Sequence, residues 1–270
     1  MGRVANNIDD IYITLCKDLI RAPKVGNTRE LWNVKLQLKD ITKNIVSVRG
    51  ISPSYLCGEL LWYFSGMNST EFISRFSSFW KSISDDGKTA NSAYGYLMKY
   101  KFGFDQIEKV IELLKADPNS RRAVINLNVP NEHVIETKDE PCTIAVQFMV
   151  RKGNLDCTTM MRSNDIWFGT PYDIAFFTEL QKYVAHRLGV GYGFYTHFVT
   201  SLHMYDRDDS KVRDILERAE SYPMTIDIEM LNDNKTVILN ALEESRDMNQ
   251  KELIVELFEK YKILKRRTHG

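Results

Sequence analysis

Cysteine is scarce in this chain, and it does not occur at the spacings that hold metals. The 270 residues include 4 cysteines, and none of them belongs to a CxxC pair or lies beside a pair of histidines. Such spacings argue against a zinc site, and so few cysteines in a chain of this length argue against a secreted disulfide scaffold. We therefore expect no metal site and reduced thiols. The cysteines are Cys16, Cys57, Cys142 and Cys157.

An excess of charge of one sign and long apolar runs are also missing. Lysine and arginine together number 36, as do aspartate and glutamate, so the net charge gives no indication of a polyanionic partner. Polynucleotide-binding proteins usually carry a basic patch or stripe, and here only Lys265-Arg266-Arg267 is strongly basic. Apolar runs fall short of a membrane span, and residues 1–10 lack the apolar core of a signal peptide. We expect a cytoplasmic protein (of the host cytoplasm if phage-encoded) that binds neither polynucleotide nor membrane.

Helical periodicity and strand-like alternation are interleaved along the chain. Short turns such as Lys152-Gly153-Asn154 join neighbouring strands, which favours antiparallel pairing. Neither a repeat nor a long linker divides the sequence. We predict one domain over 1–270 with an α/β (α+β) fold and a mixed, largely antiparallel sheet. The predicted helices are 8–20, 53–66, 105–114, 171–188, 212–219 and 251–264, and the main predicted strands are 32–38, 123–129, 143–150, 155–161 and 224–230.

Two neighbouring motifs carry the chemistry. Glu140-Pro141-Cys142-Thr143 is followed by Arg162-Ser163-Asn164-Asp165, so a thiol, an arginine and a carboxylate recur within a short stretch. Cysteine attacks only as the thiolate, and its ordinary pKa of ~8.5 falls beside a cation, so a nearby arginine would help to ionise Cys142. The residues alone leave a second interpretation open, in which Cys142 is a small buried core residue.

A series of motifs in order resembles the thymidylate synthase superfamily over roughly residues 28 to 206. The resemblance implies a three-layer α/β fold, a homodimer, and one-carbon transfer from 5,10-methylenetetrahydrofolate to a pyrimidine nucleoside monophosphate. The motifs are Glu59-Leu60-Leu61-Trp62-Tyr63, Tyr94-Gly95, Ser120-Arg121-Arg122, Pro141-Cys142, Gln147-Phe148, Arg162-Ser163-Asn164-Asp165, Gly169-Thr170-Pro171-Tyr172-Asp173 and His203-Met204-Tyr205.

By this resemblance, Cys142 is the nucleophile that adds to carbon 6 of the base. Addition makes carbon 5 reactive, so that covalent catalysis divides one difficult step into easier ones. Glu59 and Tyr94 would transfer protons, although Tyr94 also suits a core position. Trp80, Asp165 and Gly169 would lie on the folate side, and Trp80 too fits the core equally well by sequence.

The resemblance assigns a further set of residues to the nucleotide. Arg162 and Ser163 would bind its phosphate, because a planar guanidinium matches phosphate oxygens. Arg121 and Arg122 would reach the phosphate of the partner subunit, and Arg29 is the candidate for a further phosphate ligand. Gln147 would contact the substrate, and His203 and Tyr205 would hydrogen-bond the sugar.

The departures from thymidylate synthases concern the base. Asp173 replaces an asparagine that pairs with uracil, and Thr143 replaces a histidine. A carboxyl that accepts from an amine and shares a proton with the ring nitrogen suits cytosine. We therefore predict a 5-hydroxymethylase of deoxycytidylate or cytidylate. In both positions the sequence resembles the deoxycytidylate hydroxymethylases of phages and related cytidylate hydroxymethylases. An aspartate that merely starts a helix is the alternative for Asp173.

Two other functions remain open from the sequence. One is thymidylate synthase-type methylation of deoxyuridylate or deoxycytidylate, and the other is a non-catalytic nucleotide-binding or RNA-binding derivative of the fold. The tail 265–270 shows no equivalent of the small residues that close thymidylate synthases, which favours access of water and a hydroxymethyl product.

Overall fold

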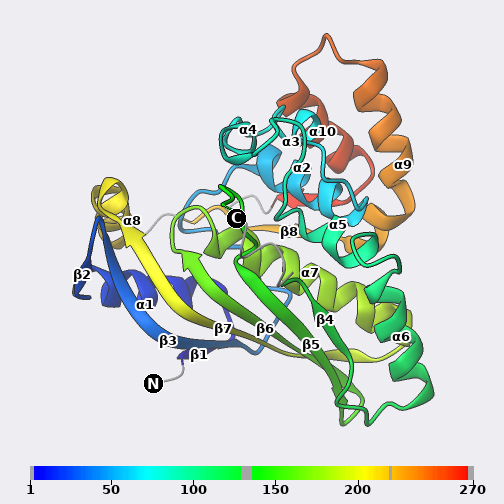
Figure 1. Ribbon diagram of the computed structural model, residues 1–270, viewed down its shortest axis with the longest axis horizontal. Coiled ribbons are helices and arrows are strands. Elements are labelled where there is room, and N and C mark those ends of the chain that lie inside the picture. The colour runs from blue at the N-terminus through cyan, green and yellow to red at the C-terminus, as the bar shows by residue number, and fades with distance from the viewer. Residues whose placement is uncertain (1–2, 129–135, 219–220, 267–270) are drawn as a thin grey trace.

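A seven-stranded mixed sheet forms the base of the molecule (Figure 1). The computed structural model describes residues 3–128, 136–218 and 221–266. The strand order is β1-β3-β7-β6-β5-β4, with β2 beside β3; β1/β3 and β6/β7 are parallel and the other pairs antiparallel. This confirms the predicted mixed, largely antiparallel sheet. The strands are β1 (Arg3–Ala5), β2 (Lys24–Val25), β3 (Thr28–Leu38), β4 (Val124–Asn126), β5 (Thr143–Arg151), β6 (Asn154–Asp165) and β7 (Gly191–Tyr205).

Several helices begin or end at residues suited to capping. Ser52 caps α2 by accepting from the amide of Tyr55, and Asp105 caps α6 in the same way. Gly189 ends α7 in the left-handed conformation with φ of 67°. The helices are α1 (Ile8–Ile20), α2 (Pro53–Phe64), α3 (Thr70–Ile73), α4 (Phe79–Ile83), α5 (Tyr94–Lys99), α6 (Gln106–Ala116), α7 (Thr170–Leu188), α8 (Asp209–Glu217), α9 (Ile228–Glu244) and α10 (Gln250–Lys260).

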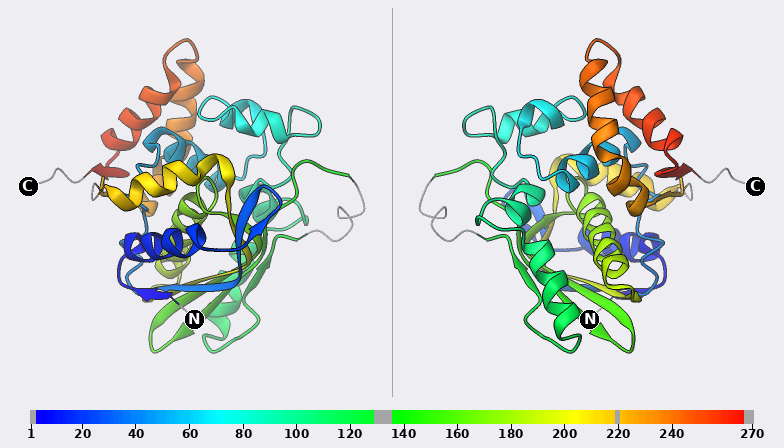
Figure 2. Two further views of the ribbon diagram at one scale, coloured as in Figure 1. Left: turned by 90° about the vertical axis from the view of Figure 1, so that its left-hand side faces the viewer. Right: turned by 90° about the vertical axis from the view of Figure 1, so that its right-hand side faces the viewer.

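The helices form two layers above one face of the sheet (Figures 1 and 2). Helices α1 and α7 lie directly on the sheet, and α2 packs on α7 through Tyr63 and Phe176, whose rings are 4.6 Å apart. Helices α9 and α10 lie outside α2. One cluster of buried hydrophobic residues joins the sheet to both helical layers. The candidate site lies where the ends of β5 and β6 meet α2 and α7.

The two faces of the sheet differ in exposure. Leu36 and Val199 point into the core and are at most 1% exposed. On the opposite face Trp32 is 74% exposed and Phe194 45%. Of the elements in the described ranges, none covers this second face (Figure 2).

The C-terminal third differs from the prediction. The expected strand 224–230 is only three residues long (β8, Met224–Ile226), because Asp227 then caps α9 by accepting from the amide of Met230. The expected last helix ends at Lys260, and after Lys262, with φ of 58°, the chain forms β9 (Leu264–Arg266) beside β8. Residues 129 and 219, at the ends of two predicted elements, and the tail from 267 lie outside the described residues.

Candidate active site

Cys142 lies immediately before β5, half-buried, where Arg162 of the neighbouring strand β6 fixes the chain around it. The guanidinium donates from Nε to the carbonyl of Pro141 at 3.1 Å and from Nη2 to that of Glu140 at 2.9 Å. The amide of Arg162 also donates to the carbonyl of Cys142 at 2.9 Å. Because three bonds join Arg162 to three consecutive residues, the thiol is held at a set position on the strand end.

The electrostatics of Cys142 correct one expectation. Arg162 lowers the pKa of the thiol, as expected, but burial outweighs it and raises that pKa to about 11. The nearby charges of Asp173 and Asp139 act in the same direction as burial. The thiol of the free protein is therefore neutral at neutral pH, and its proton must leave as it attacks.

Glu59 is a buried acid on the otherwise apolar helix α2. Its side chain is 5% exposed and accepts a hydrogen bond from the hydroxyl of Tyr55 at 2.6 Å, one helical turn earlier. Trp80 of α4 in turn donates from Nε1 to that hydroxyl at 3.0 Å. Burial raises the pKa of Glu59 to about 8, Tyr55 lowers it, and the charge of Asp173 raises it. Glu59 can therefore carry a proton at neutral pH, as an acid or a base requires.

Asp173 stands in the first turn of α7, opposite Cys142 and Glu59. Burial raises the pKa of its carboxyl to about 7, against the effect of hydrogen bonds from Asn164 and Tyr94. Asn164 of β6 donates from Nδ2 to Asp173 Oδ2 at 2.7 Å. The structure thus brings the four predicted catalytic residues into mutual electrostatic contact: Cys142, Glu59, Tyr94 and Asp173.

The loop between β6 and α7 is shaped by Asp165 and Gly169. The carboxylate of Asp165 accepts from the amides of Trp167 at 2.9 Å and Phe168 at 3.3 Å. A Cβ at Gly169 would meet Asn164 Nδ2 at 2.7 Å, so glycine is needed for α7 to approach this strand. Both residues therefore act on the backbone of the site.

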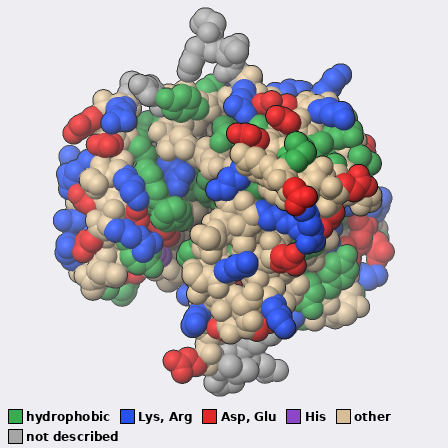
Figure 3. All heavy atoms as spheres, turned by 90° about the horizontal axis from the view of Figure 1, so that it is seen from above, with side chains coloured by type: hydrophobic (Ala, Val, Ile, Leu, Met, Phe, Trp, Pro, Cys, Tyr) green, Lys and Arg blue, Asp and Glu red, His purple; other side chains and the backbone are tan. Residues whose placement is uncertain are grey.

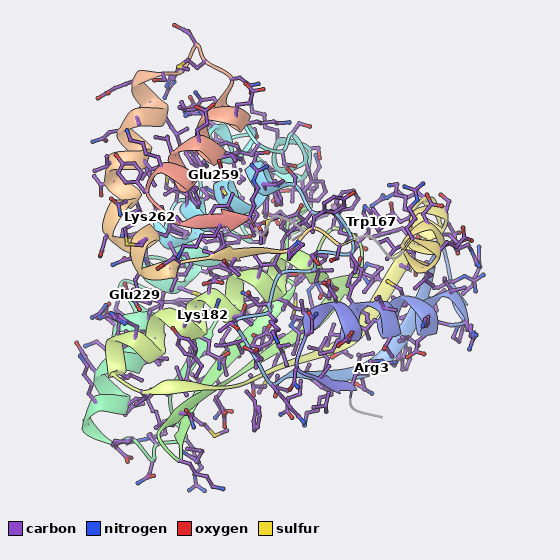
Figure 4. All side chains as sticks on the ribbon, turned by 180° about the vertical axis from the view of Figure 1, so that it is seen from behind. Arg3, Trp167, Lys182, Glu229, Glu259 and Lys262 are labelled. Carbon is purple, nitrogen blue, oxygen red and sulfur yellow. The ribbon has the colours of Figure 1, made fainter. Side chains whose placement is uncertain are left out.

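An aromatic and cationic surface borders the loop. The guanidinium of Arg49 lies 4.6 Å over the ring of Trp167, which is labelled in Figure 4, and Lys211 of α8 approaches the same ring. Phe168 is 52% exposed beside them, and Arg207 lies 6.0 Å from its ring. The surface is hollowed between α8 and the outer helices, with hydrophobic and basic side chains around the hollow (Figure 3). Exposed rings flanked by cations suit a ligand with flat rings and carboxylates.

The sugar and phosphate candidates gather at the same end of β6 as Arg162 and at the adjoining ends of β7 and β3. Ser163 pairs with Ser201, and Asp165 with His203, across β6 and β7. The rings of His203 and Tyr205 are 5.1 Å apart in an edge-to-face contact. Arg29 of β3 faces the same strand end and is held by the carbonyl of Ala22 at 3.0 Å and by Asp209 at 4.0 Å.

The paired arginines are not brought to Cys142 of their own chain. Arg121 and Arg122 are exposed just before β4, and Gln147 donates from Nε2 to the carbonyl of Arg121 at 2.9 Å. Gln147 is five residues along the strand from Cys142, roughly 17 Å at the rise of an extended chain. Gln147 therefore contacts the arginine segment and lies apart from the cysteine cluster.

Three residues that contact the site were not predicted from the sequence. Tyr55 binds buried Glu59 and Asn164 binds Asp173, and buried His197 lies 3.1 Å from Asn164 Oδ1. The spacing of Tyr55 four residues before Glu59 on one helix was the available signal. Asn164 and His197 come from different strands, and neither showed a comparable signal.

No helix in the described part of the chain is both long and apolar enough to cross a membrane.

Comparisons with known proteins assign the family. The chain is 34% identical over 180 residues to the deoxyuridylate hydroxymethyltransferase of Pseudomonas phage M6, covering 66% of this chain and 51% of that protein. It is 29% identical over 248 residues to the deoxyuridylate hydroxymethyltransferase of Bacillus phage SP01, covering 83% of this chain and 65% of that protein. It is 26% identical over 208 residues to the thymidylate synthase of Clostridium beijerinckii, covering 73% of this chain and 77% of that protein.

The chain thus spans between about half and two thirds of the length of the two phage proteins. A family model described as thymidylate synthase matches residues 21–263, nearly the whole chain. The fold, with its mixed sheet and helices, agrees with this match. Together these findings show that the chain belongs to the thymidylate synthase family, whose enzymes transfer one carbon to a pyrimidine nucleotide.

Proposed function

We propose that this protein hydroxymethylates carbon 5 of deoxycytidylate, or of cytidylate, with 5,10-methylenetetrahydrofolate and water. The observation that carries the proposal is the carboxyl of Asp173, held by Asn164 beside Cys142 and Glu59. Its pKa, raised to about 7 by burial, lets it hold a proton at neutral pH. A cytosine needs a donor at its ring nitrogen and an acceptor at its amine, and a carboxylic acid supplies both groups.

The chemistry of the protein begins at Cys142. Its Sγ bonds to carbon 6 of the base as the thiol proton passes to water, and the ring nitrogen becomes more basic. The proton of Asp173 then stabilises the adduct, and carbon 5 becomes nucleophilic. In this proposal Tyr94 helps to remove the proton of carbon 5, and Glu59 exchanges protons with water and with the base.

The residues around the loop fit the folate. Trp167 and Phe168 of the loop offer aromatic faces, and Arg49 and Lys211 offer positive charge for carboxylates. Trp80, the other candidate, is 7% exposed and packs against Trp62. When bound, 5,10-methylenetetrahydrofolate supplies the one-carbon unit. Asp165 and Gly169 keep the loop in the conformation that exposes Phe168.

The names of the two phage relatives support a hydroxymethyl product, since both are hydroxymethyltransferases. They also favour a second candidate substrate, because both are named for deoxyuridylate. Asp173 is the reason that we rank cytidylate first. The Clostridium relative keeps methylation, the thymidylate synthase reaction, as a further alternative.

We propose further that the enzyme is a single-domain homodimer whose sheets pack face to face. The uncovered sheet face exposes Trp32 and Phe194, and large exposed apolar surfaces mark interfaces. Arg121 and Arg122 lie too far along the sheet to serve the Cys142 of their own chain. In a face-to-face dimer they would complete the phosphate site of the partner subunit.

Mass spectrometry of the product tests the main proposal. The enzyme is given 5,10-methylenetetrahydrofolate and an equimolar mixture of deoxycytidylate, cytidylate, deoxyuridylate and uridylate, while absorbance reports dihydrofolate. We expect a hydroxymethylated cytidylate and no dihydrofolate, since dihydrofolate forms only when the folate donates hydride. A hydroxymethylated uridylate would establish the second candidate, and a methylated product with dihydrofolate would establish the methylase.

Subunit mixing tests the dimer. A double variant of Arg121 and Arg122 is mixed with Cys142→Ser under conditions in which subunits exchange. Because each variant lacks a different part of the composite site, the mixed dimer should regain one complete site. Demonstrated exchange without any return of turnover would refute the shared site.

A further inference from the structure

Asn164 is a buried amide whose contacts join Asp173 to the interior of the sheet. It is 2% exposed, and its Nδ2 donates to Asp173 Oδ2 at 2.7 Å. Its Oδ1 lies 3.1 Å from His197 Nε2 and 2.8 Å from the hydroxyl of Thr170. Both ends of the amide are therefore engaged, one by the acid and the other by the core.

His197 determines which way this amide points. The Thr170 hydroxyl also reaches the carbonyl of Asp165 at 3.0 Å, so it can donate to either oxygen and fixes nothing alone. His197 is fully buried, and burial lowers its pKa to about 3, so the ring is neutral and carries one hydrogen. With that hydrogen on Nε2, the ring can only donate to Asn164, so the amide must present its oxygen to His197.

Tyr195 controls the other ring nitrogen. Its fully buried hydroxyl donates to the hydroxyl of Thr159 at 3.2 Å and lies closer, at 2.9 Å, to His197 Nδ1, with which it can share that hydrogen. A hydroxyl that donates to Nδ1 leaves the hydrogen of the imidazole on Nε2. The row Tyr195–His197–Asn164 is itself buried and ends with an N–H directed at Asp173.

We propose that Tyr195, His197 and Asn164 are positioning residues that decide which oxygen of Asp173 carries the proton, and thereby which base is accepted. The Asn164 N–H keeps Oδ2 an acceptor, which directs the acid proton to Oδ1; Tyr94, the other hydrogen-bond partner of Asp173, carries a hydroxyl that can accept as well as donate. Cytosine needs the protonated oxygen at its ring nitrogen and the bare oxygen at its amine, whereas uracil needs the reverse. The oxygen held by Asn164 is thus the one that accepts from the cytosine amine.

This inference deepens the proposed function and rests on it for the identity of the base. A carboxylic acid can pair with either pyrimidine if its proton is free to move between oxygens. Discrimination of isosteric bases arises only where a buried polar group is left unpaired by the wrong one. The fixed amide of Asn164 holds the proton on one oxygen of Asp173, so that the wrong base leaves a buried polar group unpaired. Asp173 alone would not discriminate in this way.

The test compares variants of His197 that differ in one donor. His197→Met removes the donor, and His197→Gln restores an N–H at the position of Nε2. The matched control is Gln181→Met, since buried Gln181 of α7 also bonds strand carbonyls but does not touch Asn164. Each variant is first shown to be folded by its thermal transition, and kcat and KM are then measured on deoxycytidylate and deoxyuridylate over pH.

In His197→Met we expect the cytidylate-to-uridylate ratio of kcat/KM to fall by about tenfold or more, mainly through kcat, with a shifted pH profile. His197→Gln should keep the ratio within about threefold, and Gln181→Met should leave it unchanged. Tyr195→Phe should act in the direction of His197→Met but less. A folded His197→Met with an unchanged ratio and pH profile would overturn the proposal, as would His197→Gln behaving like His197→Met.

Nitrogen NMR of histidine-labelled, unmodified protein separates this inference from the proposed function. We expect His197 to be neutral with its hydrogen on Nε2 throughout the neutral pH range. A hydrogen on Nδ1 would reverse the amide and refute the positioning role, whichever base is used. If the unmodified enzyme prefers uridylate while His197 carries Nε2–H, the proposed function fails but the fixed amide stands.

Discussion

The two sides of the site are built differently. On the strand side, backbone atoms hold the chemistry: Arg162 binds the carbonyls of Glu140 and Pro141 and thereby fixes Cys142. On the helix side, side chains hold each other, since Tyr55 binds Glu59 and Asn164 binds Asp173. The strand side presents one neutral thiol, and the helix side presents two acids that titrate near neutral pH.

This difference suits the two sides to different steps of the reaction, nucleophilic attack and proton transfer. A nucleophile must meet carbon 6 at a set distance, which a rigid strand end provides. Proton transfer needs groups whose pKa lies near the working pH, which burial and a few exchangeable hydrogen bonds provide. We therefore expect changes on the strand side to reduce turnover, and changes on the helix side to alter base choice and pH dependence.

Cys142→Ser should have the largest effect. The hydroxyl is a far weaker nucleophile, so we expect turnover to fall by roughly 10⁴-fold or more while nucleotide binding is retained. Release of tritium from carbon 5 of labelled nucleotide measures the loss. Cys157→Ala is the control, because buried Cys157 lies in the interior of β6. Turnover of Cys142→Ser within about tenfold of the unmodified enzyme would contradict covalent catalysis.

Asp173→Asn should change the base with the thiol left in place. The amide donates to oxygen 4 of uracil and accepts from its ring nitrogen, so preference should move toward uridylate by roughly 30- to 5,000-fold. We expect the product to remain hydroxymethylated, because this side chain does not supply the water. The measurements are kcat/KM on both nucleotides and product mass. An unmodified enzyme that already prefers uridylate would make Asp173 a residue that merely starts α7.

Arg162→Lys tests the strand side more finely. An ammonium cannot bind the carbonyls of Glu140 and Pro141 in the geometry of the guanidinium, so kcat/KM should fall by about 100-fold, in kcat as well as KM. Arg151→Lys is the matched control, since Arg151 also donates to a backbone carbonyl of β5, at its far end. Equal losses in both variants would show that the effect is general to the strand.

Tyr55→Phe should have the smallest effect on turnover, within about tenfold, and a clear effect on pH dependence. The Tyr55 hydroxyl stabilises ionised Glu59, so its removal should move the pKa of Glu59 further up. The pH limb assigned to Glu59 should therefore shift to higher pH. A limb that stays in place would remove Glu59 from the proton transfer.

The same carboxyl gives a stability prediction with a definite sign. Glu59 binds its proton more tightly in the folded than in the unfolded protein, whose glutamate pKa is ~4.3. Folding stability is therefore full below that value and is lost as pH rises toward about 8. The loss is at most about 5 kcal/mol at ~1.4 kcal/mol per unit of pKa. Glu59→Gln should flatten this slope in chemical unfolding measured across pH; an unchanged slope would contradict the pKa shift.

The sequence predicted the strand side more completely than the helix side. Cys142, Arg162 and Asp165 fall in contiguous motifs, and the alternating residues of β5 and β6 reveal the strands that carry them. Glu59 was predicted from the motif Glu59-Leu60-Leu61-Trp62-Tyr63, in which it is the one charge among apolar residues. Its pKa could not be predicted, because it depends on burial under α4 and α7.

What the sequence could not show depends on pairing between distant strands. His197 meets Asn164 only because β6 and β7 pair in parallel in one register, and no local pattern specifies that partner. Helix α9 was missed because the strand-like residues of β8 run directly into its start at Asp227. The single domain, the dimer and the roles of the individual site residues remain predictions.

The neutral thiol of Cys142 has a consequence for how the enzyme withstands oxidants and alkylating agents. Such reagents attack thiolates, and burial raises the pKa of each of the cysteines, to about 11 for Cys142 and higher for the other three. We therefore expect the thiols of the resting enzyme to react slowly with peroxide or iodoacetamide. If the nucleophile loses its proton only when it attacks a bound nucleotide base, chemical inactivation should depend on turnover.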